Sequence, residues 1–132
     1  MSSKKIIFAV DDEASMGEIY QAILGDTYDL HFFEMGEDLL NLALSMKPHL
    51  VIIDTGLADM SGYLLCQELK HKEEMQEVPV VFVTGQDFSE DKGRAFFSGG
   101  SEYITKPIKA APFCALLERL IEDFRSNQLD LD

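Results

Sequence analysis

Short apolar runs of strand length alternate with longer segments of helical periodicity along almost the whole chain. A parallel sheet covered by helices on both faces produces this alternation, because its central strands are buried on both sides. The predicted strands span residues 5–10, 28–33, 50–54, 79–84 and 101–105. The predicted helices span residues 14–25, 37–46, 62–72, 89–98 and 110–125. Five βα units in a row predict an α/β domain with right-handed crossovers.

Acidic residues follow two of the predicted buried strands. Asp11 and Asp12 come directly after the apolar run IIFAV, and Asp54 comes directly after LVII. In an open parallel sheet, ligands bind beyond the carboxyl ends of the strands, so these three carboxylates are expected to gather there. Grouped carboxylates repel one another unless a cation joins them, and an all-oxygen set favours Mg²⁺. Taken singly, each acid is equally compatible with a helix cap or a turn.

The last two predicted strands end in groups that suit phosphoryl transfer. Thr84 ends the fourth predicted strand and Lys106 follows the fifth, on the sheet edge that carries the acids. A carboxylate can attack phosphorus, while a divalent cation and a lysine neutralise the phosphoryl oxygens and a hydroxyl donates a hydrogen bond. The combination predicts a metal-dependent carboxylate site in which one acid is a nucleophile.

In these motifs the chain resembles the receiver domain of two-component response regulators. The resemblance rests on Asp11-Asp12-Glu13, Asp54, Thr84-Gly85 and Lys106-Pro107, each in order at a strand end. It covers about residues 5–125 and implies a flavodoxin-like, doubly wound five-stranded parallel sheet of order 2-1-3-4-5 with five helices. The domain is assigned to residues 1–125, followed by a short acidic tail at 126–132 that looks frayed.

The resemblance also implies a metal and acceptor set. Asp54 is the implied phosphoacceptor. The implied ligands of Mg²⁺ are Asp11, Asp12, Asp54 and the backbone carbonyl of Gly56.

Further roles follow from the same resemblance. Lys106 is expected to pair with the phosphoryl group, and Thr84 to hydrogen-bond it and draw its loop inward. Tyr103 is expected to be an aromatic switch that swings inward as Thr84 moves, although a fixed, half-buried aromatic fits the same pattern. The Lys106–Pro107 bond is expected to be cis, on the family alone.

The chain departs from the family pattern beside the acceptor. Ala58 stands where members usually carry Pro, so the loop has less conformational restriction. Gly56 and Gln86 occupy two places whose side chains tune hydrolysis of the acyl phosphate, and their combined effect has no predictable sign. Phe96 and Phe97 are adjacent in the fourth predicted helix, and one of the two rings is a candidate for a partner or dimer surface.

Composition limits the partners and the location. The 132 residues carry a net charge of −13, which argues against direct binding to nucleic acid or to an anionic membrane. The two cysteines, Cys66 and Cys114, have no metal-like spacing and are expected to be reduced. Only five apolar residues follow the basic start before Asp11, too few for a signal peptide, so a cytoplasmic location is expected.

The leading prediction is a phosphorylatable signalling switch and not a metabolic enzyme. Its expected donor is a sensor histidine kinase or a histidine phosphotransfer protein. Its expected output is a downstream protein or an attached output domain, contacted through the surface of the fourth helix, fifth strand and fifth helix. The sequence is compatible with a stand-alone receiver or with a piece of a larger regulator.

Alternative functions remain open at this point. One is a Mg²⁺-dependent phosphatase with an aspartyl-phosphate intermediate, although such enzymes place a second carboxylate where this chain has Gly56. Another is a non-phosphorylated interaction module that keeps the fold. A flavodoxin-like cofactor binder is disfavoured because acids replace a phosphate-cradling loop after the first strand.

Overall fold

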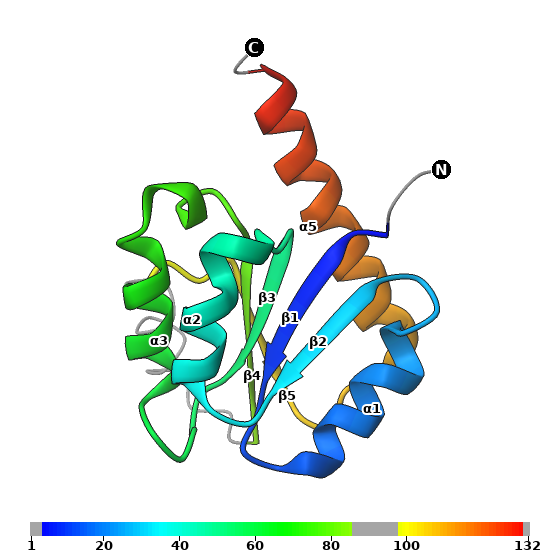
Figure 1. Cartoon of the computed structure of the whole chain (residues 1–132). Helices are drawn as coiled ribbons and strands as arrows, with labels where there is room; N and C mark the ends of the chain where they lie inside the picture. Colours follow the sequence, from blue (N-terminus) through cyan, green and yellow to red (C-terminus); the bar gives the residue numbers. More distant parts are fainter. Residues whose placement is uncertain (1–3, 86–97, 131–132) are drawn as a thin grey trace.

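The five strands form a single parallel sheet in the order β2-β1-β3-β4-β5. The computed structural model describes residues 4–85 and 98–130 (Figure 1). The strands are β1 (Ile6–Val10), β2 (Asp29–Phe33), β3 (Leu50–Asp54), β4 (Val80–Thr84) and β5 (Glu102–Thr105). The order and direction of the strands confirm the predicted flavodoxin-like sheet, and every strand lies within one residue of its predicted bounds.

The helices cover both faces of this sheet, as Figure 1 shows. They are α1 (Ala14–Leu24), α2 (Gly36–Met46), α3 (Gly62–Lys70) and α5 (Ala110–Asp130), with a 3₁₀ turn η1 (Glu73–Met75) that was not predicted. The predicted helix at 89–98 falls almost wholly outside the described residues. Among the described residues, no helix is both long and apolar enough to cross a membrane.

Side-chain alternation along the central strands builds two cores. Phe8 and Val10 of β1 pack with Leu39 of α2 and Leu65 of α3 on one face. Ile7 and Ala9 face the other way; the second core contains Ile7, Ala9, Tyr20, Leu24, Phe113, Leu117 and Ile121, from β1, α1 and α5. Strands β3 and β4 are buried along their whole length, while the edge strands β2 and β5 are only partly covered. The apolar runs of the sequence therefore mark the central strands, as predicted.

Helix α5 is longer than predicted. It continues to Asp130 instead of ending near residue 125, so the backbone of 126–130 is helical and not an irregular tail. Residues 126–130 contain neither Gly nor Pro, so nothing in them interrupts the helical hydrogen bonding. In Figure 1 the C-terminal part of α5 projects past the end of the sheet.

The N-terminus of α2 is capped by a carboxylate from a distant loop. Its own N-cap residue, Met35, offers no side-chain hydrogen bond. Instead, Asp59 accepts hydrogen bonds from the N–H groups of Gly36 (3.0 Å) and Glu37 (3.1 Å). Burial raises the pKa of this carboxyl, but the backbone donors lower it by more, so its net pKa lies below the usual value. Asp59 thereby ties the loop after β3 to α2.

We expect Asp59→Ala to lower the free energy of unfolding by about 1 kcal/mol at neutral pH, as for other lost caps. Because the folded pKa is depressed, the stabilisation is present above the unfolded pKa of about 3.9 and is lost as the pH falls through the folded value. Urea unfolding at pH 7 and pH 3 checks this. Asp59→Asn, which keeps one acceptor oxygen, is the control, and equal losses for Ala and Asn at pH 7 would contradict the capping role.

Candidate functional site

The three predicted acids meet at the carboxyl ends of β1 and β3. Asp11 follows β1 and is fully buried, Asp54 is the last residue of β3 and only 8% exposed, and Asp12 is exposed to solvent. One carboxylate oxygen from each lies within 4.8 Å of the other two. The exposed Asp12 leaves one side of the cluster accessible from solvent. The geometry therefore brings together the acids that the sequence predicted to be neighbours.

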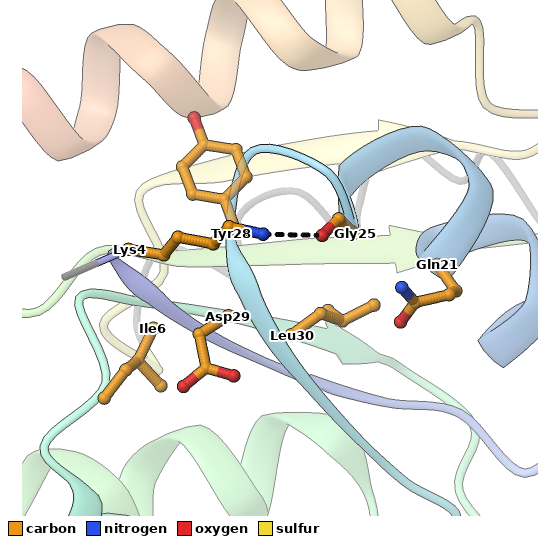
Figure 2. Close-up of a pocket in the computed structure, with 7 residues that line it drawn as sticks. All are labelled: Lys4, Ile6, Gln21, Gly25, Tyr28, Asp29 and Leu30. Carbon is orange, nitrogen blue, oxygen red and sulfur yellow. Dashed lines mark hydrogen bonds between the residues drawn. The ribbon is translucent and has the colours of Figure 1, made fainter.

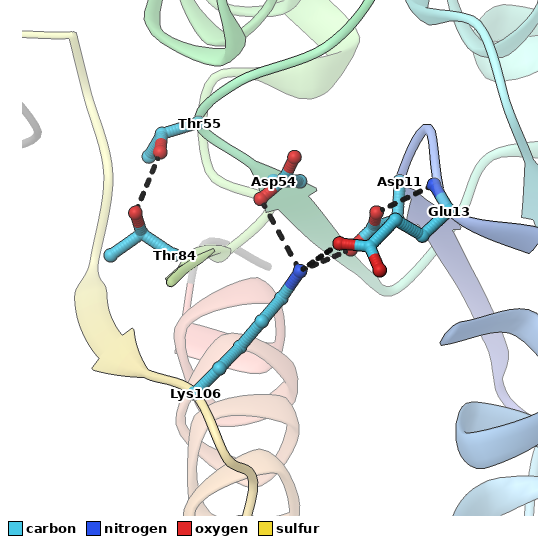
Figure 3. A network of polar contacts seen from close by, with 6 residues as sticks. All are labelled: Asp11, Glu13, Asp54, Thr55, Thr84 and Lys106. Atoms are coloured by element: carbon cyan, nitrogen blue, oxygen red, sulfur yellow. Dashed lines mark hydrogen bonds and ion pairs between the residues drawn. The ribbon is translucent and has the colours of Figure 1, made fainter. Parts of the chain in front are cut away.

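Lys106 reaches into this acidic cluster from the turn after β5 (Figure 3). Its Nζ lies 2.9 Å from Asp11 Oδ2, 3.7 Å from an oxygen of Asp54 and 3.8 Å from Glu13 Oε1. Burial lowers the pKa of Lys106, but the hydrogen bond to Asp11 and the surrounding negative charges raise it by more. The ammonium thus stays charged. The carboxylates around Lys106 outnumber its single positive charge, and this excess of negative charge suits a divalent cation.

The Asp54 carboxyl is held in an environment that disfavours its charge. Burial, then the charge of Asp11 and to a smaller extent that of Asp12, raise the pKa of Asp54 to about 6, although Lys106 and the Gly56 N–H act in the opposite direction. A cation beside this carboxylate would relieve the repulsion and return it to the ionised form. The donor set is all oxygen, so these residues fit Mg²⁺.

The backbone around Lys106 is attached to the end of β4. Its N–H donates to the Thr84 carbonyl oxygen over 2.7 Å, which extends the β4–β5 pairing by one step. The Lys106–Pro107 peptide bond is cis, as the family resemblance implied. The hydrogen bond to Thr84 fixes the backbone from which the Lys106 side chain reaches the acids.

Thr84 is buried at the end of β4, and its hydroxyl has a partner that the sequence did not predict. Thr55 Oγ1 donates a hydrogen bond to Thr84 Oγ1 over 2.9 Å (Figure 3). The two residues are 29 positions apart in sequence. The register of β3 and β4 pairs Asp54 with Val83. Thr55 and Thr84, which follow these two residues, are neighbours only because of this register.

The loop after Asp54 is open at Gly56 and tight at Gly62. A Cβ atom at Gly56 would meet nothing within 4 Å, so there is open space beside this residue. A Cβ atom at Gly62 would lie 2.2 Å from the Asp54 carbonyl oxygen and 2.8 Å from Thr55 Cα. The sequence indicated Gly62 only as the start of a helix and gave no sign of its close approach to Asp54.

Only some of the remaining predicted residues lie in the part of the chain that the structure describes. Tyr103 lies on β5, partly buried against the core beneath α2 and α3, and its switching role stays a prediction. Gln86, Phe96 and Phe97 lie outside the described residues. Cys66 and Cys114 are both free, as expected.

A cavity of about 590 Å³ lies at the amino ends of β1 and β2, away from the acids (Figure 2). Lys4 reaches across it to donate to the Gly25 carbonyl oxygen over 3.4 Å. The lining residues are Lys4, Ile6, Gln21, Gly25, Tyr28, Asp29 and Leu30. Because it lies at the opposite strand ends from Asp54, this cavity takes no part in the acidic site.

Comparisons with known proteins agree with the family resemblance in the sequence. A family model described as the response regulator receiver domain matches residues 7–118. The heme response regulator HssR of Staphylococcus epidermidis is 27% identical over 117 residues, covering 89% of this chain and 51% of that protein. The transcriptional regulatory protein CssR of Bacillus subtilis is 30% identical over 117 residues, covering 88% and 51%. The chain thus spans about half the length of these curated relatives.

Solved structures show the same fold. The BeF3-activated receiver domain of DrrB superposes with a TM-score of 0.82 at 29% identity, covering 90% of this chain and 98% of that one. The signal receiver domain of a putative LuxO repressor protein from Vibrio parahaemolyticus has a TM-score of 0.88 and covers 96% of each chain. At 22% identity, the second likeness is one of fold alone.

Proposed function

Because this chain belongs to the response regulator receiver domain family, we propose that it is a phosphorylatable switch in which Asp54 accepts a phosphoryl group. The observation that carries the proposal is the position of Lys106 Nζ, 2.9 Å from Asp11 and 3.7 Å from Asp54, beside three clustered carboxylates. This arrangement supports the proposal because it combines, at one edge of the sheet, a carboxylate that would act as the nucleophile, a positive charge and an all-oxygen donor set.

The proposed transfer uses a phosphohistidine donor on a sensor histidine kinase or a histidine phosphotransfer protein. A carboxylate oxygen of Asp54 attacks phosphorus, the new O–P bond forms as the P–N bond breaks, and the electron pair returns to the imidazole nitrogen. Asp11, Asp12, Asp54 and the Gly56 carbonyl would hold Mg²⁺, which supplies charge neutralisation at the phosphoryl oxygens. The domain is in this sense a signalling acceptor that catalyses only its own phosphorylation and dephosphorylation.

The same side chains would stabilise the product. Lys106, held by Asp11 in the present structure, is close enough to Asp54 to pair with a phosphoryl oxygen after a small movement. Thr84 would turn its hydroxyl to the phosphoryl group, and Tyr103 on β5 would follow it inward. The phosphoryl group would thereby favour one of two pre-existing conformations.

The proposed output is a protein contact at the face that includes β5 and α5. A downstream protein or an output domain would recognise that face, and self-association through it to a homodimer is part of the same hypothesis. The proposal includes the cytoplasmic location expected from the sequence, and no direct contact with nucleic acid or membrane. An aspartyl-phosphate phosphatase is disfavoured because Gly56, which has no carboxyl group, stands where such enzymes carry a general acid.

Incubation with acetyl phosphate and Mg²⁺, followed by intact-protein mass spectrometry, tests the proposal. We expect the mass of one phosphoryl group to be added, and the addition to require both Mg²⁺ and Asp54. Asp54→Asn should remain unmodified, whereas Asp38→Asn, which changes an exposed acid on α2, should be modified like the wild type.

If no phosphoryl group is detected, beryllofluoride binding shows why, because beryllofluoride forms a stable analogue of the acyl phosphate. Binding of beryllofluoride without detectable phosphorylation would indicate fast hydrolysis. If the folded wild type takes up neither a phosphoryl group from acetyl phosphate nor beryllofluoride, the chain is a non-phosphorylated interaction module and the proposal is wrong.

A further inference from the structure

The residue directly after the acceptor carries a second hydroxyl that contacts the switch threonine. We propose that Thr55 is a positioning residue that holds Thr84 in the unphosphorylated arrangement and so lowers the population of the active conformation. The inference rests on the proposed function, because it concerns the same switch. Its basis is the 2.9 Å hydrogen bond from Thr55 Oγ1 to Thr84 Oγ1.

The pleat of the sheet places this pair on the side away from the acceptor side chain. Asp54 is paired in register with Val83, which packs in the core beneath α1 and α5. Ile53 packs in the opposite core, beneath α2 and α3. Because successive side chains alternate between the two faces of the sheet, Thr55 and Thr84 extend toward the face that α2 and α3 cover. Figure 3 shows their contact apart from the contacts that join Lys106 to the carboxylates.

A phosphoryl group on Asp54 therefore competes with Thr55 for the position of the Thr84 hydroxyl. To donate to a phosphoryl oxygen, Thr84 must bring Oγ1 toward Asp54 and away from Thr55. The Thr55 contact stabilises only the outward arrangement, so it opposes the movement. Thr84 is only 5% exposed, so the contact between the two hydroxyls is shielded from competing water.

The first test measures beryllofluoride affinity in the presence of Mg²⁺ by isothermal titration calorimetry. Thr55→Val keeps the side-chain shape but removes the hydroxyl. Since a neutral hydrogen bond contributes on the order of 1 kcal/mol, we expect Thr55→Val to bind beryllofluoride about three- to tenfold more tightly than the wild type. Thr55→Ser, which keeps the hydroxyl, should restore the wild-type affinity.

A double-mutant cycle separates positioning from a general structural effect. In a Thr84→Val background no hydroxyl is present for Thr55 to hold, so adding Thr55→Val should leave the affinity unchanged. An unchanged or weaker affinity for Thr55→Val, or the same gain in the Thr84→Val background, would overturn the inference. If Thr55→Val does not fold, Thr55→Ala replaces it in the same cycle.

The failure of this inference is distinguishable from failure of the proposed function. Wild-type protein that binds beryllofluoride, with no effect of Thr55→Val, refutes the role of Thr55 and leaves the phosphoacceptor intact. Wild-type protein that takes up neither a phosphoryl group from acetyl phosphate nor beryllofluoride refutes both.

Discussion

Gly62→Ala should lower the free energy of unfolding by about 3 kcal/mol, because the added Cβ atom has no room. It would lie 2.2 Å from the Asp54 carbonyl oxygen, 2.8 Å from Thr55 Cα and 2.9 Å from Ile53 Cγ2. Two of these three atoms belong to the backbone, which cannot move aside as a flexible side chain can. Either α3 or the end of β3 must shift, and the Gly62 N–H bond to the Thr55 carbonyl oxygen would lengthen.

The matched control is Gly56→Ala in the same loop. Its Cβ atom would have no neighbour within 4 Å, so we expect a change within about 1 kcal/mol, of either sign. Urea unfolding followed by circular dichroism measures both variants, since the chain contains no Trp for fluorescence. Equal stabilities for Gly62→Ala and the wild type would show that the loop accommodates the methyl group and that the close approach is not required.

Removal of the acceptor carboxylate should have the opposite effect on stability. We expect Asp54→Asn to raise the free energy of unfolding by about 2 kcal/mol at pH 7.5 in the absence of Mg²⁺. The buried carboxyl has its pKa raised from 3.8 to about 6, which corresponds to about 3 kcal/mol of disfavoured ionisation. The amide avoids this cost, although its N–H groups must find new partners.

The pH dependence follows from the direction of the shift. Because the folded pKa exceeds the unfolded pKa, the contribution of Asp54 to stability is complete below about pH 4 and is lost as the pH rises through about 6. The advantage of Asp54→Asn should therefore disappear at pH 4. A difference that is independent of pH would show that packing, and not ionisation, separates the two proteins.

Magnesium provides a second control for the same variant. Mg²⁺ binding to the folded site should stabilise the wild type increasingly as the Mg²⁺ concentration rises above its Kd. It should stabilise Asp54→Asn much less. Addition of Mg²⁺ should therefore shrink or reverse the difference at pH 7.5. Thermal unfolding with and without Mg²⁺ measures this, with Asp38→Asn expected to respond like the wild type.

The position of the acids was predictable because it depends on the apolar runs along the sequence. Apolar runs such as Leu50–Ile53 are continuous where a strand is buried on both faces, and the chain must leave such strands at the sheet edge. Asp11 and Asp54 follow such runs directly and Lys106 follows the edge strand β5, so their meeting at one edge follows from the parallel arrangement.

The bounds of the last helix were less accessible from sequence. Polar residues after Phe124 resemble a frayed end, yet α5 continues to Asp130 because no residue there breaks the helix. Helix ends depend on small differences in propensity and capping, whereas a long apolar stripe determines where the helix packs.

Contacts between distant segments were decided only by the tertiary structure. The Asp59 cap on α2, the approach of Gly62 to Asp54 and the Thr55–Thr84 hydrogen bond each join residues whose sequence context carries no matching signal. They depend on strand register and loop path, which are set by the packing of the whole domain. The sequence by itself determined the sheet, its covering helices and the acidic edge, because buried strands and helices require apolar residues at a regular spacing along the chain. Contacts between individual atoms leave no regular spacing in the sequence, so the supporting contacts around Asp54 were visible only in the folded chain.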